Sequence, residues 1–195
     1  MILLFPFILF GQKCEHSNLS DQFNISIQLK ENSKKNPAFD SLYLKLIITL
    51  KDGTHTQTIR RNMAWLWDKE YFDCQNVRSY SKSINDENRV VDNDFGDFIV
   101  ADLNFDQKDD FAFIHDSGGN GGPEYYFYIQ KKDGTFERNI FLCEEMVRFP
   151  HEINYKKKEL TTLTRAGASA VGKAIFSLNP LTNRWYLKSR ELLTD

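Results

Sequence analysis

The sequence predicts an all-β protein built from antiparallel sheets, in a sandwich or propeller-like arrangement with long loops. Three observations favour this class. Short segments rich in β-branched and aromatic residues recur along the chain, Asp-Gly pairs separate some of them, and helix-period patterns are scarce. The 195 residues are 41% hydrophobic and 27% charged, which is ordinary globular composition. A formal net charge of -2 gives no electrostatic argument for binding nucleic acid.

The chain begins with an apolar stretch, MILLFPFILF, that contains no polar residue. A helix needs about 20 apolar residues to cross a bilayer, so this stretch is too short, but it suits the hydrophobic region of a signal peptide. The alternative is a buried first strand, which Pro6 argues against. We therefore expect residues 1–12 to be a signal peptide and residues 13–195 to form a single all-β domain. The protein is then exported to the periplasm or cell envelope.

The three cysteines are Cys14, Cys74 and Cys143. Export permits a disulfide, but the sequence does not choose among the alternative pairs. Cys14 follows the apolar stretch almost at once, at the place where a lipoprotein would carry its lipid. Membrane association is therefore expected only if Cys14 is lipidated, and the charged Lys13 before it is not the small residue that such a signal usually has.

In the first half, residues 23–29 alternate apolar and polar side chains, which predicts a half-buried strand. Residues 41–50 form a longer apolar segment, and Asp52-Gly53 turns the chain into a third strand over residues 54–60. Residues 15–22 are polar and expected to be loose. Residues 63–83 and the polar stretch after them predict a long loop.

Strand signals resume at residue 98. The predicted strands cover residues 98–101, 111–114, 125–129, 136–141, 152–155, 159–163, 170–178 and 185–188, with turns at Asp133-Gly134 and over residues 179–182. A single helical turn is expected over residues 144–147. The small residues of 161–172 suggest another loop, in which Arg165 would be an ordinary solvated side chain or would pair with a partner carboxylate. His16, His55 and His151 are expected at the surface without partners.

One loop carries the spacing of a metal site. Oxygen-bearing side chains occur at Asp102, Asn104, Asp106 and Asp110, which are positions one, three, five and nine of an EF-hand-type loop, and the Lys108 carbonyl would supply position seven. Three carboxylates this close repel one another without a cation. We expect one structural Ca²⁺, the alternative being a solvated acidic turn.

Two positions depart from the EF-hand pattern. The sixth is Gln107 where the sharp turn normally takes Gly, and the twelfth is Phe113 rather than a bidentate Glu. The segment from Val100 to Phe113 resembles the FG-GAP type calcium loop of integrin-like propeller blades. The wider order of acidic loop, Gly-rich loop, aromatic strand and late Trp185-Tyr186 resembles a bacterial periplasmic family with a single such loop. Its best-known member is an immunity protein that blocks a lysozyme-like peptidoglycan hydrolase delivered by a type IV secretion system.

The second candidate site is the glycine-rich segment from His115 to Tyr126. It is not a phosphate loop, because no Gly-Lys-Ser/Thr follows and no helix begins there. A glycine loop on a rigid sheet suits a protein-binding wedge. The resemblance implies that this loop enters the cleft of a lysozyme-like hydrolase. The expected contact residues are His115, Gly118, Asn120, Tyr125 and Tyr126, although strand alternation places Tyr125 and Tyr126 on opposite faces.

No arrangement of residues predicts catalysis. His115, Asp116 and Ser117 are adjacent along the chain, whereas a triad is assembled from distant segments. The sequence therefore predicts no catalytic residue and no enzyme. It favours a calcium-binding inhibitor or immunity protein, and the alternative is a calcium-dependent binding or adhesion module for protein or glycan.

Overall fold

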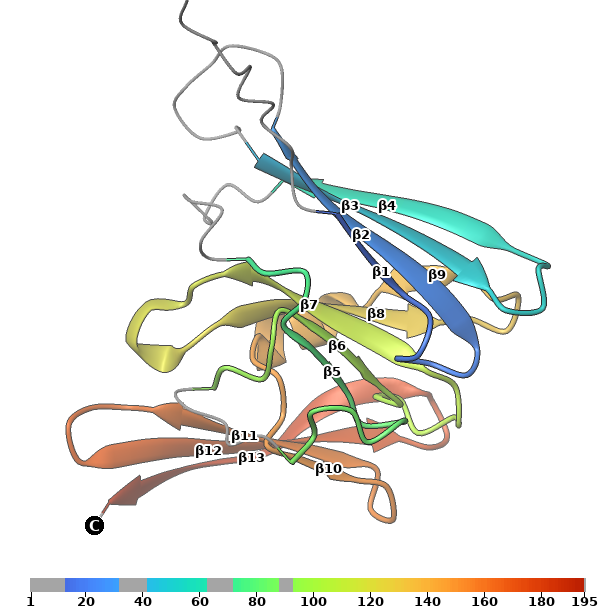
Figure 1. Cartoon of the computed structure of the whole chain (residues 1–195). Helices are drawn as coiled ribbons and strands as arrows, with labels where there is room; N and C mark the ends of the chain where they lie inside the picture. The colour runs from blue at the N-terminus through green and yellow to red at the C-terminus, as the bar shows by residue number, and fades with distance from the viewer. Residues whose placement is uncertain (1–12, 32–41, 63–71, 88–92, 195) are drawn as a thin grey trace, which may run out of the picture.

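A computed structural model describes residues 13–31, 42–62, 72–87 and 93–194. Three β-sheets lie one above another in Figure 1. The first lies at the top in blue and cyan, the second in the middle in green and yellow, and the third at the bottom in orange and red. The prediction of an all-β, sandwich-like protein is confirmed. The expected signal peptide lies outside the described residues.

Sheet 1 is an antiparallel meander in the order β1-β2-β3-β4. Its strands are β1 (Lys13–His16), β2 (Phe23–Glu31), β3 (Leu42–Leu50) and β4 (Thr56–Asn62). Alternation along β2 and β3 brings Ile25, Ile27, Leu44, Leu46 and Ile48 into the core. Asp52-Gly53 forms the predicted turn, with φ of 75° at Gly53.

Sheet 2 has the order β5-β6-β7-β8-β9, and β5 runs parallel to β6. Its strands are β5 (Val77–Ser79), β6 (Phe98–Ala101), β7 (Asp110–Asp116), β8 (Glu124–Gln130) and β9 (Phe136–Arg138). Both faces of this sheet are covered. Phe23 of sheet 1 packs against Phe111 and Phe136, and Phe149 packs against Tyr125 and Phe127 on the opposite face. This explains why its strands are nearly continuous apolar runs.

Sheet 3 is a second antiparallel meander in the order β10-β11-β12-β13. Its strands are β10 (Glu152–Asn154), β11 (Glu159–Arg165), β12 (Ala170–Asn179) and β13 (Arg184–Thr194). A π-helical turn, η3 (Leu142–Met146), precedes it close to the predicted helical turn. Phe141 and Phe176 are in edge contact, so the inner face of sheet 3 packs towards η3. The inner face is the face of sheet 3 that carries Leu160, Ala174 and Phe176.

Three predictions about local structure are wrong. Residues 15–22 are not wholly loose, because β1 pairs with β2. Residues 77–79 form β5 inside the segment expected to be a loop. Residues 161–165 belong to β11, so the loop expected over residues 161–172 is confined to a short connection. The small residues of this segment suggested a loop, but Thr161 and Thr162 are buried in the strand.

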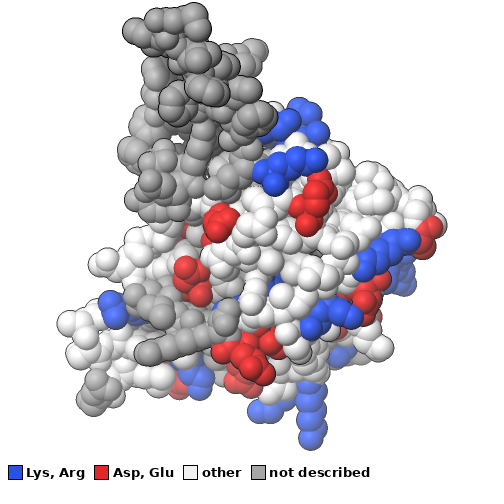
Figure 2. All heavy atoms as spheres, in the orientation of Figure 1, with Lys and Arg blue, Asp and Glu red and all other residues white. Residues whose placement is uncertain are grey.

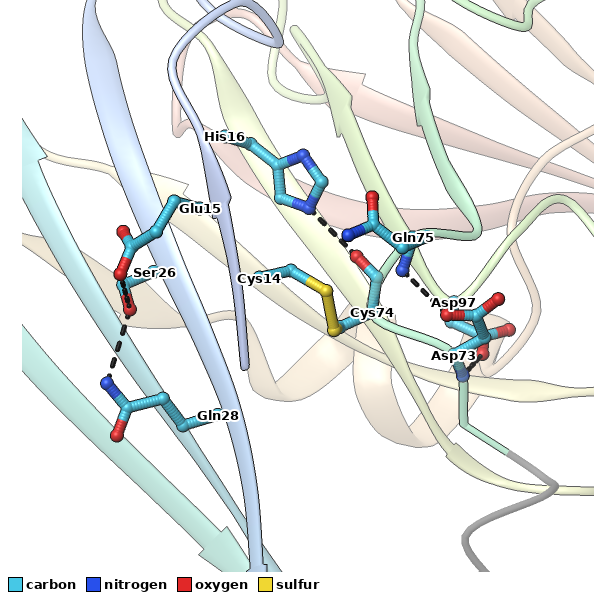
Figure 3. Close-up of a disulfide and its surroundings, with 9 residues drawn as sticks. All are labelled: Cys14, Glu15, His16, Ser26, Gln28, Asp73, Cys74, Gln75 and Asp97. Atoms are coloured by element: carbon cyan, nitrogen blue, oxygen red, sulfur yellow. Dashed lines mark hydrogen bonds between the residues drawn. A yellow bond between two sulfur atoms is a disulfide. The ribbon is translucent and has the colours of Figure 1, made fainter. Parts of the chain in front are cut away.

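A disulfide joins Cys14 of β1 to Cys74, with a Cα–Cα distance of 5.8 Å (Figure 3). The Cys14 sulfur is therefore occupied in this structure and is not available for lipid. His16 is buried beside the bridge, with Nε2 2.8 Å from the Cys74 carbonyl oxygen. This corrects the expectation of a surface histidine without a partner. Cys143 is buried and free.

Basic and acidic side chains are interspersed over the face shown in Figure 2, without a field of one sign. In the part of the chain that the structure describes, no helix has the length and apolar character needed to span a membrane.

Candidate metal loop and partner-binding loop

The acidic loop connects β6 to β7, and its side-chain oxygens turn inward. Asp102 accepts hydrogen bonds from the backbone N–H groups of Asp106 (3.1 Å) and Gln107 (2.9 Å). Asn104 Oδ1 accepts a second bond from Asp106 N (3.1 Å), and Asp106 Oδ1 accepts one from Lys108 N (3.0 Å). The structure therefore brings the predicted side chains of positions one, three and five into one turn, in which Asp102 and Asn104 are half-buried and Asp106 is exposed.

Two residues in this turn have a left-handed backbone. Phe105 has φ of 63° and Gln107 has φ of 68°. The position that normally takes Gly does adopt the conformation that favours Gly, and here Gln107 adopts it at a steric cost.

Asp110, the predicted ligand of position nine, is fully buried at the start of β7. Its Oδ2 accepts hydrogen bonds from the N–H groups of Leu103 (2.9 Å) and Asn104 (3.2 Å). Its Oδ1 accepts a bond from Gln130 N in the neighbouring strand (2.8 Å). Asp110 thus holds the loop closed and ties it to β8, whatever else it binds.

Burial and mutual repulsion both act on the carboxyl groups of the loop. Burial raises the pKa of Asp102, and the nearby Asp106 carboxylate raises it further. Burial also raises the pKa of Asp110 well above its ordinary value, with added repulsion from Asp106 and Asp102. A cation bound among these groups would offset both effects.

The donor set is chemically suited to calcium, because it consists of carboxylate and amide oxygens. Gln130 lines a groove together with Asn104 and Asp106, and its buried Oε1 has no hydrogen-bond partner. Among the described residues, however, no three His, Cys, Asp or Glu side chains are grouped as in a metal site. The carboxylates instead accept bonds from the loop's own N–H groups. The Lys108 amine donates to the Lys131 carbonyl oxygen (2.9 Å).

The sequence did not indicate the residues that anchor this loop to the other two sheets. Buried Asp109 accepts hydrogen bonds from the hydroxyls of Ser20 (2.5 Å) and Ser81 (2.5 Å). Phe105 contacts sheet 3, and its ring lies 5.8 Å from the ring of Tyr155 and 5.9 Å from that of Trp185. The loop therefore contacts elements of all three sheets, and only its own spaced oxygens gave a local signal.

The glycine-rich loop between β7 and β8 projects from one end of the middle sheet in Figure 1, and it includes the short helix η2 (Gly119–Gly121). The Arg148 side chain binds the backbone of this loop. Arg148 Nε donates to the Gly121 carbonyl oxygen (2.5 Å) and Nη2 donates to that of Gly118 (3.3 Å). Asn93 Nδ2 also donates to the Gly121 carbonyl oxygen (2.8 Å). The loop is tightly turned and held by side chains, not loosely connected.

Two glycines are required by this packing. Gly118 has φ of 62°, and a Cβ there would overlap the Gly122 carbonyl oxygen. A Cβ at Gly121 would overlap the Arg148 guanidinium. The close approach of Arg148 to the loop backbone therefore depends on glycine.

The structure separates the expected contact residues. Asn120 is exposed at the tip of the loop. Tyr125 is fully buried, donates its hydroxyl proton to the Gly96 carbonyl oxygen (3.0 Å) and accepts a bond from Phe95 N (3.2 Å). This corrects the expectation that Tyr125 contacts a partner, because its strand position faces the core between sheets 2 and 3.

Tyr126 and His115 lie together on the opposite face. Their rings stack with centroids 3.9 Å apart, and the Arg138 guanidinium lies 5.3 Å from the Tyr126 ring centroid. Arg138 was not predicted, since only the register of β8 with β9 brings it near. Burial lowers the pKa of His115, and the nearby Arg138 charge lowers it further.

Comparisons with family models, with curated proteins and with solved structures found no match to this chain.

Proposed function

We propose that this chain is an exported, calcium-stabilised protein whose glycine-rich loop enters the active-site cleft of a lysozyme-like peptidoglycan hydrolase and inhibits it. The observation that carries the proposal is the loop held by Arg148, because a narrow loop that is already ordered loses little entropy when it binds. Nothing in this proposal requires catalysis by the chain itself.

The chemistry at the tip suits such a cleft. Hydrolases of glycosidic bonds use a pair of carboxyl groups, one of which is protonated. The exposed Asn120 amide offers both a donor and an acceptor, so it can meet a carboxyl group in either state. The stacked pair His115–Tyr126 with Arg138 offers an aromatic and cationic surface of the kind that dominates protein interfaces. The Cys14–Cys74 disulfide supports an oxidising, extracytoplasmic location.

Inhibition is tested with purified protein, a panel of lysozyme-type muramidases and a peptidoglycan-clearing assay. We expect inhibition of at least one muramidase, and Asn120→Ala should weaken it about tenfold or more, as for a residue at the centre of an interface. Ser169→Ala, at the exposed tip of the β11–β12 hairpin, is the matched control and should inhibit like the original chain. If no muramidase is inhibited while the chain binds glycan in the presence of calcium, the alternative of a binding or adhesion module replaces this proposal.

The calcium ion is proposed to be bound by the side chains of Asp102, Asn104, Asp106 and Asp110 with the Lys108 carbonyl. A bound ion stabilises the fold by about 2.7 kcal/mol at a concentration one hundred times its Kd. We expect EDTA to lower the melting temperature and added calcium to restore it.

The variant Asp102→Asn should abolish this calcium response. Asp133→Asn is the matched control, because Asp133 is also an aspartate that accepts hydrogen bonds inside a turn, from Thr135 N and its hydroxyl (3.0 and 2.7 Å). A melting temperature that moves with neither reagent would remove the ion from the proposal.

A further inference from the structure

A groove of ≈ 260 Å³ lies between η3 and the inner face of sheet 3, and no residue of the acidic loop or the glycine-rich loop lines it. Residues from η3, β11, β12 and β13 line it. Its volume exceeds that of an apolar cavity of about 150 Å³ that holds benzene, so it has room for a small organic molecule.

The floor of the groove is apolar. Met146, Ala174 and Phe176 line it, and each is at most 8% exposed. Gly172 leaves the groove open at one side, because a Cβ built there would meet nothing closer than the Thr164 carbonyl oxygen at 3.6 Å. An aliphatic chain could lie on this surface and remove it from water.

The charge at the rim is positive. Arg190 pairs in register with Ala174, so its side chain is on the inner face with the floor residues. Among the described residues no acidic side chain forms an ion pair with Arg190, whereas the neighbouring Lys173 is paired with Glu191 (3.0 Å). Arg148 also lines the groove, but its guanidinium already donates to the glycine-rich loop and lies 3.7 Å from Glu124. Glu145 is the single acidic residue among those that line the groove.

We infer that this groove binds a small aliphatic monocarboxylate. Its hydrocarbon chain would lie along Ala174 and Phe176, and its carboxylate would pair with the Arg190 guanidinium. A planar guanidinium matches a carboxylate with two parallel hydrogen bonds, and the apolar floor excludes a strongly hydrated anion such as phosphate. The inference does not depend on the proposed function.

The test uses the full chain and two probes of equal length, hexanoate and hexan-1-ol, followed by NMR titration. We expect hexanoate to shift the amide signals of β12 and η3 and hexan-1-ol to bind at least about tenfold more weakly, since hydrogen bonds between charged groups are stronger than those of a neutral hydroxyl. Equal affinity for the two probes, or no binding of hexanoate, would overturn the inference.

Two variants localise the site. Arg190→Ala should weaken hexanoate binding about tenfold without changing the binding of hexan-1-ol. Gly172→Val should reduce the binding of both probes, because the valine side chain fills the groove. Arg184→Ala is the control, since Arg184 is exposed near the other end of β13 and pairs with Asn179 outside the groove. If Arg190→Ala binds hexanoate as tightly as the Arg184→Ala control, the assigned carboxylate partner is wrong.

Discussion

Gln107 has a left-handed backbone in the middle of the acidic loop, and its N–H is used by Asp102. Its carbonyl oxygen accepts a bond from Gln22 Nε2 (3.2 Å), while its side chain is exposed. The hydrogen bonds to Asp102 and Gln22 therefore fix the Gln107 backbone, and the Gln107 side chain adds only the steric cost of its Cβ.

Gln107→Gly should consequently stabilise the fold by about 1 kcal/mol, because glycine takes this conformation without the left-handed penalty of about 1–2 kcal/mol. Urea unfolding measured with EDTA present isolates this effect from metal binding. Lys132→Gly, at an exposed turn position without a positive φ, should give no gain. Equal or lower stability of Gln107→Gly would show that the glutamine side chain contributes contacts of its own.

Single residues also show how far the sequence could predict the site. The sequence predicted that Asp102, Asn104 and Asp106 share one turn, because they lie within five residues of one another along the chain. Alternation separated Tyr125 from Tyr126 but did not say which faced the core, since both faces of sheet 2 are covered by other sheets. Asp109 was missed because its partner Ser20 lies 89 residues away.

At the scale of elements, Arg148 connects the glycine-rich loop to η3. It is the second residue after the end of η3. The Arg148 side chain is only 13% exposed, and its Nη1 lies 3.7 Å from Glu124 at the start of β8. One guanidinium thus fastens the loop at Gly118 and Gly121 and at the strand that leaves it. The glycines are recognisable as a motif in the sequence. Arg148 is not, because it lies 27 residues or more along the chain from the glycines that it contacts.

Arg148→Ala should release the loop. Amide hydrogen exchange at residues 118–122 should accelerate at least about tenfold, which corresponds to losing about 1.4 kcal/mol of local stability, while the amides of β3 stay protected. Arg148→Lys should not restore protection, since an ammonium lacks the planar fork that reaches two carbonyls. Arg60→Ala, a change at an exposed arginine of β4, is the control. Unchanged exchange in Arg148→Ala would show that the glycine loop is ordered by its own backbone.

At the scale of the whole molecule, strand positions and the turns at Asp52-Gly53 and Asp133-Gly134 were predictable, because alternation and turn chemistry are local. The stacking of the sheets was not, because it depends on contacts such as Phe23 with Phe136 and the bridge between Cys14 and Cys74. Three cysteines left the pairing open, and only the fold shows that Cys14 pairs with Cys74 and that Cys143 is buried and free.

The disulfide closes a segment of 60 residues and joins sheet 1 to the segment that leads into sheet 2. Its loss in a Cys14→Ala/Cys74→Ala variant should lower the free energy of unfolding by about 4 kcal/mol on the chain-entropy scale. Urea unfolding measures this difference. Dithiothreitol should destabilise the original chain and a Cys143→Ala variant equally, and leave the double variant unchanged. A double variant as stable as the original would contradict a stabilising bridge.

The acidic loop has a consequence for the rates of folding. Its anchors come from Ser20 and Gln22 near one end of the chain and from Trp185 near the other, so the loop reaches its native shape only when distant segments have met. Interactions that form late in folding mainly lower the unfolding rate. A ligand of this loop would therefore lower the unfolding rate and leave the folding rate nearly unchanged.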